Sequence, residues 1–96
     1  MTSRNVILGH EFYCCICGSK GIPIPRRKGA EREPGHLKRL FCLQCGTETN
    51  HCECVPNSKY DKNDFWIEFN NGNFDIDGNR IRPYGELRNM IHNGEI

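Results

Sequence analysis

The sequence predicts a small α+β domain that is held together by a group of cysteines. The chain has 96 residues, of which only 36% are hydrophobic, so its core is expected to be thin. Four of the seven cysteines form two copies of the pattern C-x-x-C-G. After residue 55 the hydrophobic spacing becomes that of short strands followed by a helix. We therefore predict one domain over residues 1–96, with a cysteine module at 14–55 and an extension at 56–96.

No targeting segment is evident in the sequence. The N-terminus lacks a basic region followed by a long apolar run, and no apolar stretch reaches the roughly 20 residues that span a bilayer. Residues 6–8 predict only a short edge strand. We therefore expect a soluble, cytoplasmic protein with no membrane partner. In a reducing cytosol, closely spaced cysteines are more often metal ligands than disulfides, and an odd number argues against a complete disulfide framework.

The two C-x-x-C-G patterns predict a metal site. Thiolates separated by two residues can bind one ion across a tight turn, and the glycine adopts the positive φ that closes the turn. Four thiolates from two turns form a closed tetrahedral shell that suits one structural Zn²⁺ ion. Ordinary buried thiols and a redox dithiol are the alternative interpretations. The predicted ligands are Cys14, Cys17, Cys42 and Cys45, with Gly18 and Gly46 after each pair.

Three further cysteines leave a question open. Alternation along a strand would place Cys52 and Cys54 on one face and His51 and Glu53 on the other. As small, weakly polar side chains, these cysteines and Cys15 fit a thin core. Alternatively, they form a second metal site, or one of Cys52 and Cys54 replaces a ligand of the first site.

The 24 residues between the two cysteine pairs are rich in proline, glycine and basic side chains, and much of this stretch is expected to be a loop. We expect a strand over residues 37–42 to pair with one over 47–55. Residues 1–45 carry a net charge of +5, and residues 46–96 a net charge of −4. The candidate nucleic-acid ligands in the basic half are Arg26, Arg27, Lys28, Arg32, Lys38 and Arg39.

A hairpin whose turn holds one cysteine pair, faced by a second pair from another turn, is a zinc ribbon. Over residues 14–55 the chain resembles small zinc-ribbon proteins encoded by phages and prophages of Gram-positive bacteria. The matching features are the basic, proline-containing loop, the G-H-x-K segment at residues 35–38, the second cysteine pair and the polar residues 47–51. The resemblance implies the ribbon fold, a phage origin and a bacterial host cell.

Residues 56–96 predict a β-meander and one short helix. Phe65, Ile67 and Phe69 alternate with polar or aromatic neighbours, which favours a strand. Turn signals at residues 70–73 and 77–78 separate it from expected strands at 74–76 and 80–82. A helix is expected over about 84–93, with one apolar face and a stop at Gly94.

Two function classes fit these features. The basic loop predicts a nucleic-acid-binding or regulatory protein, with DNA and RNA both possible, because arginine matches phosphate geometry. Phe12, Tyr13 and Phe41 would stack on unpaired bases if exposed. The alternative is a protein that binds and modulates a host enzyme of transcription or defence, steered by the acidic second half. For both charge patterns, the competing interpretation is that the charges only keep the protein soluble.

An enzyme is not expected. His36, His51 and Glu53 are the candidates for a metal-dependent nuclease site. Catalytic zinc, however, keeps an open coordination position, whereas two complete cysteine pairs close the shell. The sequence also lacks a nucleophile motif, a phosphate-binding glycine loop and an HExxH pair.

Overall fold

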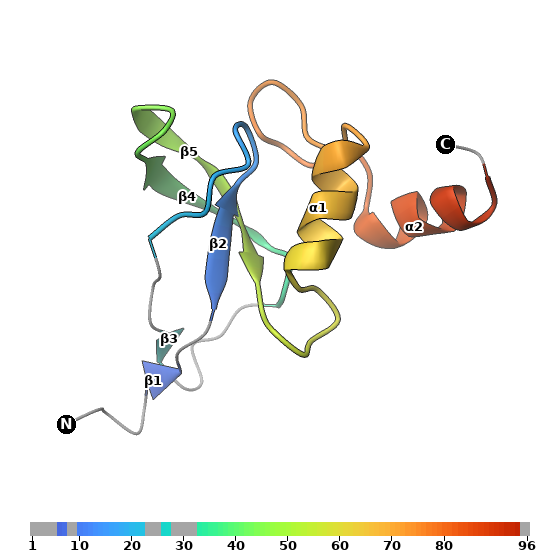
Figure 1. Cartoon of the computed structure of the whole chain (residues 1–96), viewed down its shortest axis with the longest axis horizontal. Coiled ribbons are helices and arrows are strands. Elements are labelled where there is room, and N and C mark those ends of the chain that lie inside the picture. The colour runs from blue at the N-terminus through green and yellow to red at the C-terminus, as the bar shows by residue number, and fades with distance from the viewer. Residues whose placement is uncertain (1–5, 8–9, 23–25, 28–32, 95–96) are drawn as a thin grey trace.

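The computed structural model describes residues 6–7, 10–22, 26–27 and 33–94. Its centre is a three-stranded antiparallel sheet in the order β2-β5-β4, with helix α1 against one face (Figure 1). Helix α2 extends beyond α1, away from the sheet. The bounds are β2 Glu11–Cys14, β4 Leu37–Cys42, β5 Thr47–Cys54, α1 Lys62–Asn70 and α2 Tyr84–His92. The described structure is therefore α+β, as the sequence predicts.

Strands β4 and β5 form the hairpin that the sequence predicts. The register runs from Cys42 opposite Thr47 to Leu37 opposite Cys52. Strand β5 lies between the other two and also pairs with β2, so that Tyr13 stands opposite Cys52. This pairing brings the first cysteine pair, at the end of β2, to the same end of the sheet as the hairpin turn.

A second, two-stranded sheet lies in the N-terminal half. It pairs β1, Val6–Ile7, with β3, Arg26–Arg27, in antiparallel fashion. The edge strand expected at residues 6–8 is therefore present at 6–7, while Leu8 lies outside the described residues. Two residues of the expected basic loop are instead in a strand.

The strand predicted at residues 64–69 is wrong, because this segment forms helix α1. Asp61 caps the helix by accepting hydrogen bonds from the backbone N–H groups of Asn63 (2.9 Å) and Asp64 (3.2 Å). The Asp64 carboxylate accepts one in return from the Asp61 N–H at 2.8 Å, which completes a capping box. The alternation of hydrophobic residues at 65, 67 and 69 predicted a strand with these residues buried on one face. In the helix, Ile67 is instead partly exposed and the polar Glu68 is fully buried.

The predicted β-meander is also wrong. In place of strands at 74–76 and 80–82, one isolated bridge joins Phe74 to Arg80 around a tight turn. The Asp75 carboxylate accepts hydrogen bonds from the backbone N–H groups of Asp77 and Asn79, both at 2.9 Å. A side chain that satisfies the turn in this way competes with a continued strand ladder.

The C-terminal helix is confirmed. Helix α2 ends at His92, and Gly94 follows with a φ of 76°. Of its expected apolar face, Leu87 is buried, whereas Met90 and Ile91 are partly exposed.

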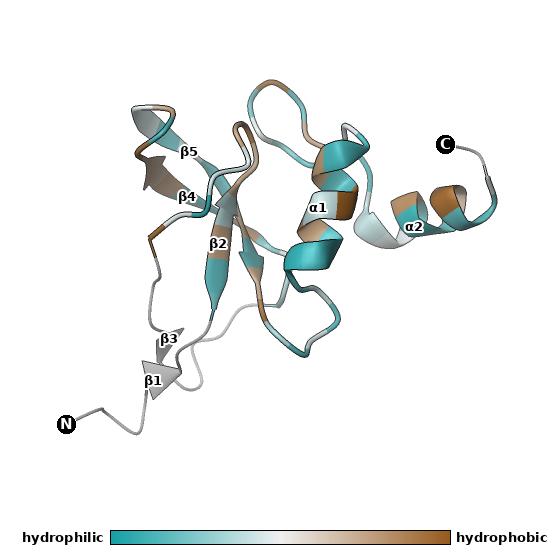
Figure 2. Ribbon diagram, viewed as in Figure 1, coloured by the Kyte–Doolittle hydropathy of each residue, from teal (hydrophilic) through white to brown (hydrophobic). Residues whose placement is uncertain are grey.

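The hydrophobic core lies between the sheet and α1. Its buried members are Tyr13, Cys15, Cys52, Cys54, Tyr60 and Phe65. The Tyr13 and Phe65 rings stack with centroids 5.2 Å apart, and Phe74 stacks on Phe65 at 5.7 Å. Figure 2 shows hydrophobic residues recurring between hydrophilic ones along β2 and α1. The cysteine module and the C-terminal extension thus share one core.

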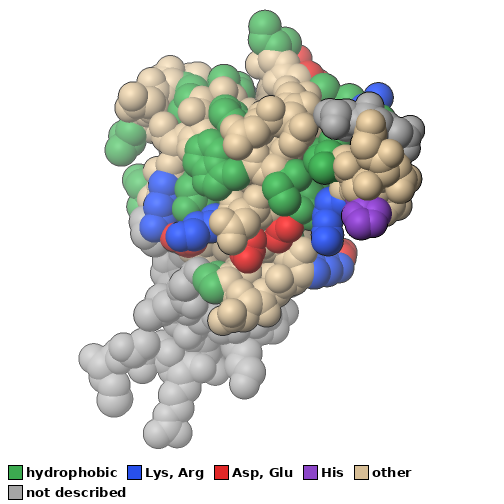
Figure 3. Space-filling view, turned by 45° about the vertical axis from the view of Figure 1, so that its right-hand side comes forward, with side chains coloured by type: hydrophobic (Ala, Val, Ile, Leu, Met, Phe, Trp, Pro, Cys, Tyr) green, Lys and Arg blue, Asp and Glu red, His purple; other side chains and the backbone are tan. Residues whose placement is uncertain are grey.

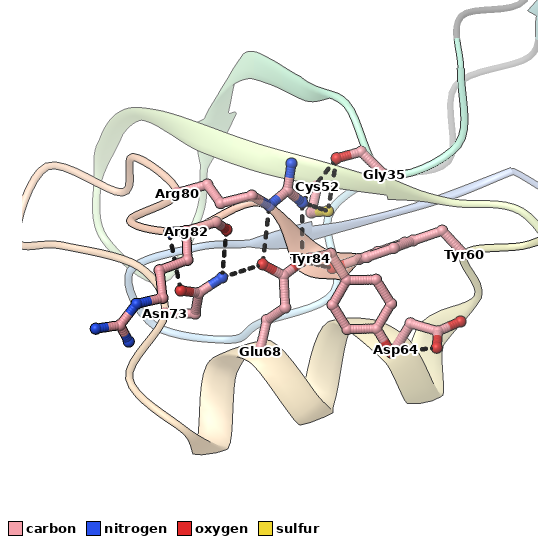
Figure 4. Close-up of polar contacts among 9 residues, drawn as sticks. All are labelled: Gly35, Cys52, Tyr60, Asp64, Glu68, Asn73, Arg80, Arg82 and Tyr84. Carbon is pink, nitrogen blue, oxygen red and sulfur yellow. Dashed lines mark hydrogen bonds and ion pairs between the residues drawn. The ribbon is translucent and has the colours of Figure 1, made fainter. Parts of the chain in front are cut away.

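A polar network lies beside this core (Figure 4). The carboxylate of Glu68 accepts hydrogen bonds from Arg80 Nε (2.8 Å) and Nη2 (2.9 Å). It also accepts from the Tyr60 hydroxyl and from Asn73 Nδ2, each at 2.5 Å. Arg80 Nη2 in turn donates to the backbone oxygen of Gly35 at 2.8 Å. The network therefore ties the C-terminal extension to the start of the hairpin.

Candidate metal centre

Four cysteine side chains meet at one end of the sheet. Their sulfur atoms all lie within 4.8 Å of one another, and they belong to Cys14, Cys17, Cys42 and Cys45. The closest approaches run between the two pairs: Cys17 to Cys42 at 3.5 Å and Cys14 to Cys45 at 3.9 Å. The structure thus brings together the four residues that the sequence predicts as ligands.

The two cysteine turns are built alike. The first residue of each pair accepts a backbone hydrogen bond from the glycine four positions later, Gly18 to Cys14 at 2.9 Å and Gly46 to Cys42 at 2.8 Å. Both glycines have a positive φ, 78° and 72° respectively. The positive φ closes each turn so that both of its sulfurs point to the same side.

Backbone N–H groups inside these turns point at sulfur. The amide of Cys17 lies 3.5 Å from Cys14 Sγ, and the amide of Cys45 lies 3.4 Å from Cys42 Sγ. The amide of Ile16 adds a third contact, at 3.4 Å from Cys14 Sγ. Such donors stabilise the thiolate form that a metal requires.

Thr49 supports the site from β5. Its hydroxyl oxygen lies 3.0 Å from Cys14 Sγ, and the contact is buried. A hydroxyl at this distance orients the sulfur and can donate to a thiolate. It is the kind of outer contact that tunes a ligand without binding the metal itself.

Two of the four thiols have pKa values shifted in opposite directions in the absence of a cation. Burial would raise the pKa of Cys17, but its contacts with Ser19, Cys42 and Cys14 lower it to about 6. Burial and contacts with the other three thiols raise the pKa of Cys45 to about 12. Four sulfurs this close cannot all carry negative charge unless a cation compensates it. The group could therefore hold a metal ion.

The remaining cysteines point into the core. Cys15, Cys52 and Cys54 are all buried in the cluster between the sheet and α1. Burial raises the pKa of the Cys15 thiol above its ordinary range, which keeps it protonated. Among the described residues, the four clustered cysteines are the only group of three or more His, Cys, Asp or Glu donors close enough for a metal. This favours the interpretation of the other three as apolar core residues.

The histidines and Glu53 take other positions. Glu53 and His51 lie on the face of β5 opposite Cys52, as alternation predicts. The Glu53 carboxylate contacts His36 Nε2 through one oxygen and His10 Nδ1 through the other, both at 2.5 Å. His51 instead contacts the backbone oxygen of Thr49. The structure thus joins Glu53 to His36 but leaves His51 apart. The contact of His10 has no signal in the sequence, because 43 residues separate it from Glu53.

The predicted nucleic-acid ligands are dispersed. Lys38 and Arg39 are adjacent on β4, so their side chains project from opposite faces of the sheet. Arg39 is exposed and lies 3.7 Å from Glu48. Arg26 and Arg27 form β3, and Lys28 and Arg32 lie outside the described residues.

Of the three aromatic side chains predicted to stack on bases, one is available. The side chain of Phe41 is 54% exposed, but Phe12 and Tyr13 are buried. Phe12 and Tyr13 are buried because β2 is covered on both faces, which the short run of sequence does not reveal.

No family model matches the sequence, and searches of curated proteins and of solved structures gave no significant match. Within the described ranges, no helix has the length and apolar character needed to cross a bilayer.

Proposed function

We propose that this protein is a zinc-stabilised ribbon that binds single-stranded nucleic acid along strand β4. The supporting observation is that β4 exposes Arg39 and Phe41 on the same face of an edge strand. A basic and an aromatic side chain in alternation are what a single strand requires, since one contacts phosphate and the other stacks on a base. Sequence specificity is not part of the proposal.

Zinc is the proposed ion because of the donor set. Four thiolates with no carboxylate or open position favour Zn²⁺ in a closed, structural role. The ion would fix the two cysteine turns and, through Cys42, the end of β4. Strand β4, which carries Arg39 and Phe41, would then be rigid where it contacts the nucleic acid. Metal and nucleic-acid binding are therefore expected to be coupled.

A competing role for Arg39 is its ion pair with Glu48. Both side chains are more than 60% exposed, at 63% and 64%, and their charged atoms are 3.7 Å apart. Exposed pairs of this kind contribute only about 0–1 kcal/mol. A phosphate can displace Glu48 at small cost, so the pair does not argue against the proposal.

Binding of a host enzyme through the acidic second half remains the alternative. It has less support, because two of the acidic side chains are already bonded within the protein. Glu68 is buried and accepts a hydrogen bond from Tyr60, and Asp64 bonds to Tyr84 and to the backbone N–H of Asp61. On the face shown in Figure 3, basic and acidic side chains lie side by side rather than in a single acidic patch. Phage origin stays a prediction from the resemblance.

The test is fluorescence anisotropy with a labelled oligothymidylate, at several salt concentrations. We expect binding that weakens as salt rises. Phe41→Ala should weaken it by loss of stacking, and Arg39→Ala should reduce its salt dependence. Ile76→Ala is the control, because Ile76 is 90% exposed and lies in the turn between Phe74 and Arg80 rather than on β4. Absence of binding in the wild type, or equal affinity in Phe41→Ala, would overturn the proposal.

A further inference from the structure

Strand β4 forms one edge of the three-stranded sheet, and the register shows which of its backbone groups face outward. The N–H of Glu53 donates to the backbone oxygen of His36 at 3.0 Å, directly beside the pair formed by Leu37 and Cys52. In an antiparallel ladder this makes Leu37 and Cys52 a non-hydrogen-bonded pair. Hydrogen-bonded and non-hydrogen-bonded pairs then alternate along the two strands.

The outward-facing groups belong to the odd-numbered residues of β4. The even-numbered residues exchange hydrogen bonds with β5, whereas the N–H and C=O groups of Leu37, Arg39 and Phe41 point away from it. The Leu37 oxygen already lies 3.2 Å from His36 Nδ1. Among the described residues, no strand pairs with this edge. Within that part of the chain, Arg39 and Phe41 therefore each present an unpaired backbone donor and acceptor.

The same two residues carry the side chains of the proposed nucleic-acid function. Arg39 and Phe41 are both exposed and lie on one face of β4, so their side chains and outward backbone groups are reached from the same side of the molecule. Lys38 adds a second positive charge on the other face, and β4 has no acidic residue. The edge is thus flanked by positive charge on both faces, which suits a phosphate backbone that runs along it.

We propose that the outer edge of β4 binds the Watson–Crick edge of an unpaired base at Arg39. The inference rests on the proposed nucleic-acid function and names the atoms that recognise the base. A base with an N–H beside a carbonyl oxygen, such as thymine, exchanges two hydrogen bonds with one residue, as a neighbouring strand would. The Arg39 N–H donates to a thymine oxygen, and the thymine N3–H donates to the Arg39 oxygen.

The spacing along β4 favours an unpaired strand. Arg39 and Phe41 are two residues apart, which is about 6.8 Å along a strand. This is twice the roughly 3.4 Å between consecutive nucleotides of one strand in a duplex. A nucleic acid with one base bonded at Arg39 and the next base stacked on Phe41 is therefore extended and unstacked. A duplex does not fit, because its bases are stacked and their Watson–Crick edges are already paired.

A second copy of the chain and a peptide strand are the competing occupants of such an edge. A second copy would bring its own Lys38 and Arg39 to the same seam, and like charges oppose pairing there. A peptide strand would satisfy the backbone groups of β4. It would not supply both a phosphate for Arg39 and a flat ring for Phe41, whereas every nucleotide carries both. The nucleic acid is therefore the occupant that the side chains favour.

The test compares two substitutions at Arg39 by anisotropy with labelled oligothymidylate. Arg39→Ala and Arg39→Pro both remove the guanidinium group, but only proline also removes the backbone N–H. An edge strand tolerates proline where the N–H faces outward, so both variants should fold and bind zinc. We expect Arg39→Pro to bind roughly fivefold more weakly than Arg39→Ala, as for one lost hydrogen bond. Equal affinity of the two folded variants would overturn the inference.

A proline one position further along β4 checks the register. The N–H of Leu40 faces β5, so Leu40→Pro removes a hydrogen bond of the ladder. Its melting temperature should fall well below that of Arg39→Pro. The reverse order would mean that the Arg39 N–H faces β5 and is not available to a base.

A second measurement uses the unaltered, zinc-loaded protein. Oligothymidylate is compared with the same oligomer methylated at N3, which keeps the phosphates and the flat ring but has no donor. We expect much weaker binding of the methylated oligomer. Hydrogen exchange of the Arg39 amide should slow only with the unmodified oligomer. An amide that is already protected in the free protein would show that another segment or a second copy covers the edge, and would overturn the inference.

The outcomes separate the two proposals. If oligothymidylate binds, but its methylated form binds equally well and the Arg39 amide does not respond, the edge contact is wrong and the nucleic-acid function stands. If free thymidine protects the Arg39 amide but no oligonucleotide binds, the edge contact stands and the wider function is wrong. If neither ligand binds, both are wrong.

Discussion

Glu68 on α1 and Arg80 on the segment that follows it form a partly buried ion pair with two hydrogen bonds, at 2.8 and 2.9 Å. Glu68 has no exposed surface, and its oxygens accept two further hydrogen bonds, from Tyr60 and Asn73. The buried charge of Glu68 is therefore tolerated because Arg80 is in place. Removing Arg80 leaves an unpaired carboxylate in the core.

We expect Arg80→Met to lower the free energy of unfolding by about 3–5 kcal/mol, because it isolates the Glu68 carboxylate. The double variant Glu68→Leu/Arg80→Met should be less destabilised than the two single variants would suggest together. Chemical denaturation of the zinc-loaded protein measures both. Additive effects would show that the two side chains are not coupled.

The exposed pair of Arg39 and Glu48 is the control for the pair of Glu68 and Arg80. Its charged atoms are 3.7 Å apart, and both side chains are more than 60% exposed, at 63% and 64%. We expect Glu48→Ala to change the free energy of unfolding by at most about 1 kcal/mol. A larger loss would mean that the pair is structural and would weaken the argument that phosphate can displace it.

Removal of the metal should unfold the cysteine module, because the metal-binding free energy of such a site is folding free energy. Elemental analysis is expected to give one zinc per chain in the wild type and none in Cys42→Ser. Circular dichroism should show loss of structure in that variant and in wild type treated with a strong chelator. Metal affinity should fall as pH falls, because protons compete for the thiolates. A chelated protein that melts like the holoprotein would show that the ion is dispensable.

Thr49→Val tests the outer contact of the metal site. The substitution keeps the side-chain shape and removes the hydroxyl that lies 3.0 Å from Cys14 Sγ. We expect zinc affinity to fall about 10- to 100-fold, with stoichiometry unchanged. Competition with a chromophoric chelator measures the affinity. Thr47→Val is the control, since Thr47 is an exposed residue of the same strand. Equal losses in both variants would attribute the effect to β5 rather than to the hydroxyl.

Cys15→Ser should retain one zinc per chain but lose stability. Cys15 is buried in the core cluster, and a serine hydroxyl there would be taken out of water. The expected cost is about 1–3 kcal/mol. Native mass spectrometry gives the metal content and chemical denaturation the stability. Loss of zinc in this variant would instead place Cys15 in the metal site.

Gly35→Ala should be more damaging than Gly46→Ala. Both glycines have a positive φ, 89° and 72°, so both substitutions carry backbone strain. Only at Gly35 would the new Cβ also meet a side chain, the Tyr60 ring at 2.9 Å, whereas nothing lies within 4 Å of it at Gly46. Thermal melts of the two zinc-loaded variants isolate the steric contribution. Equal melting temperatures would show that the Tyr60 ring can move aside.

The two cysteine turns were predictable because the geometry of each turn is set locally. Each C-x-x-C-G turn places its own two sulfurs through a positive-φ glycine and a four-residue backbone hydrogen bond. The hairpin from Leu37 to Cys54 was predictable for the same reason, since the second turn lies between its strands. The capping box of Asp61 and Asp64 was a local signal for α1. We relied on the alternation of residues 65–69 instead and predicted a strand.

The sequence by itself determined each C-x-x-C-G turn, the hairpin and the final helix, because each depends on residues a few positions apart. The meeting of the two cysteine turns depends on the pairing of β2 with β5. Only the tertiary structure decided the rest. Glu68 is buried in α1 because Arg80 supplies its counter-charge. Tyr13 is buried because the Phe65 and Trp66 rings of α1 pack on it. The contact of Glu53 with His10 also depends on strand register. A polar group is buried at low cost only when a residue from another segment supplies its hydrogen bond or counter-charge. A local sequence pattern does not show which distant residue will do so.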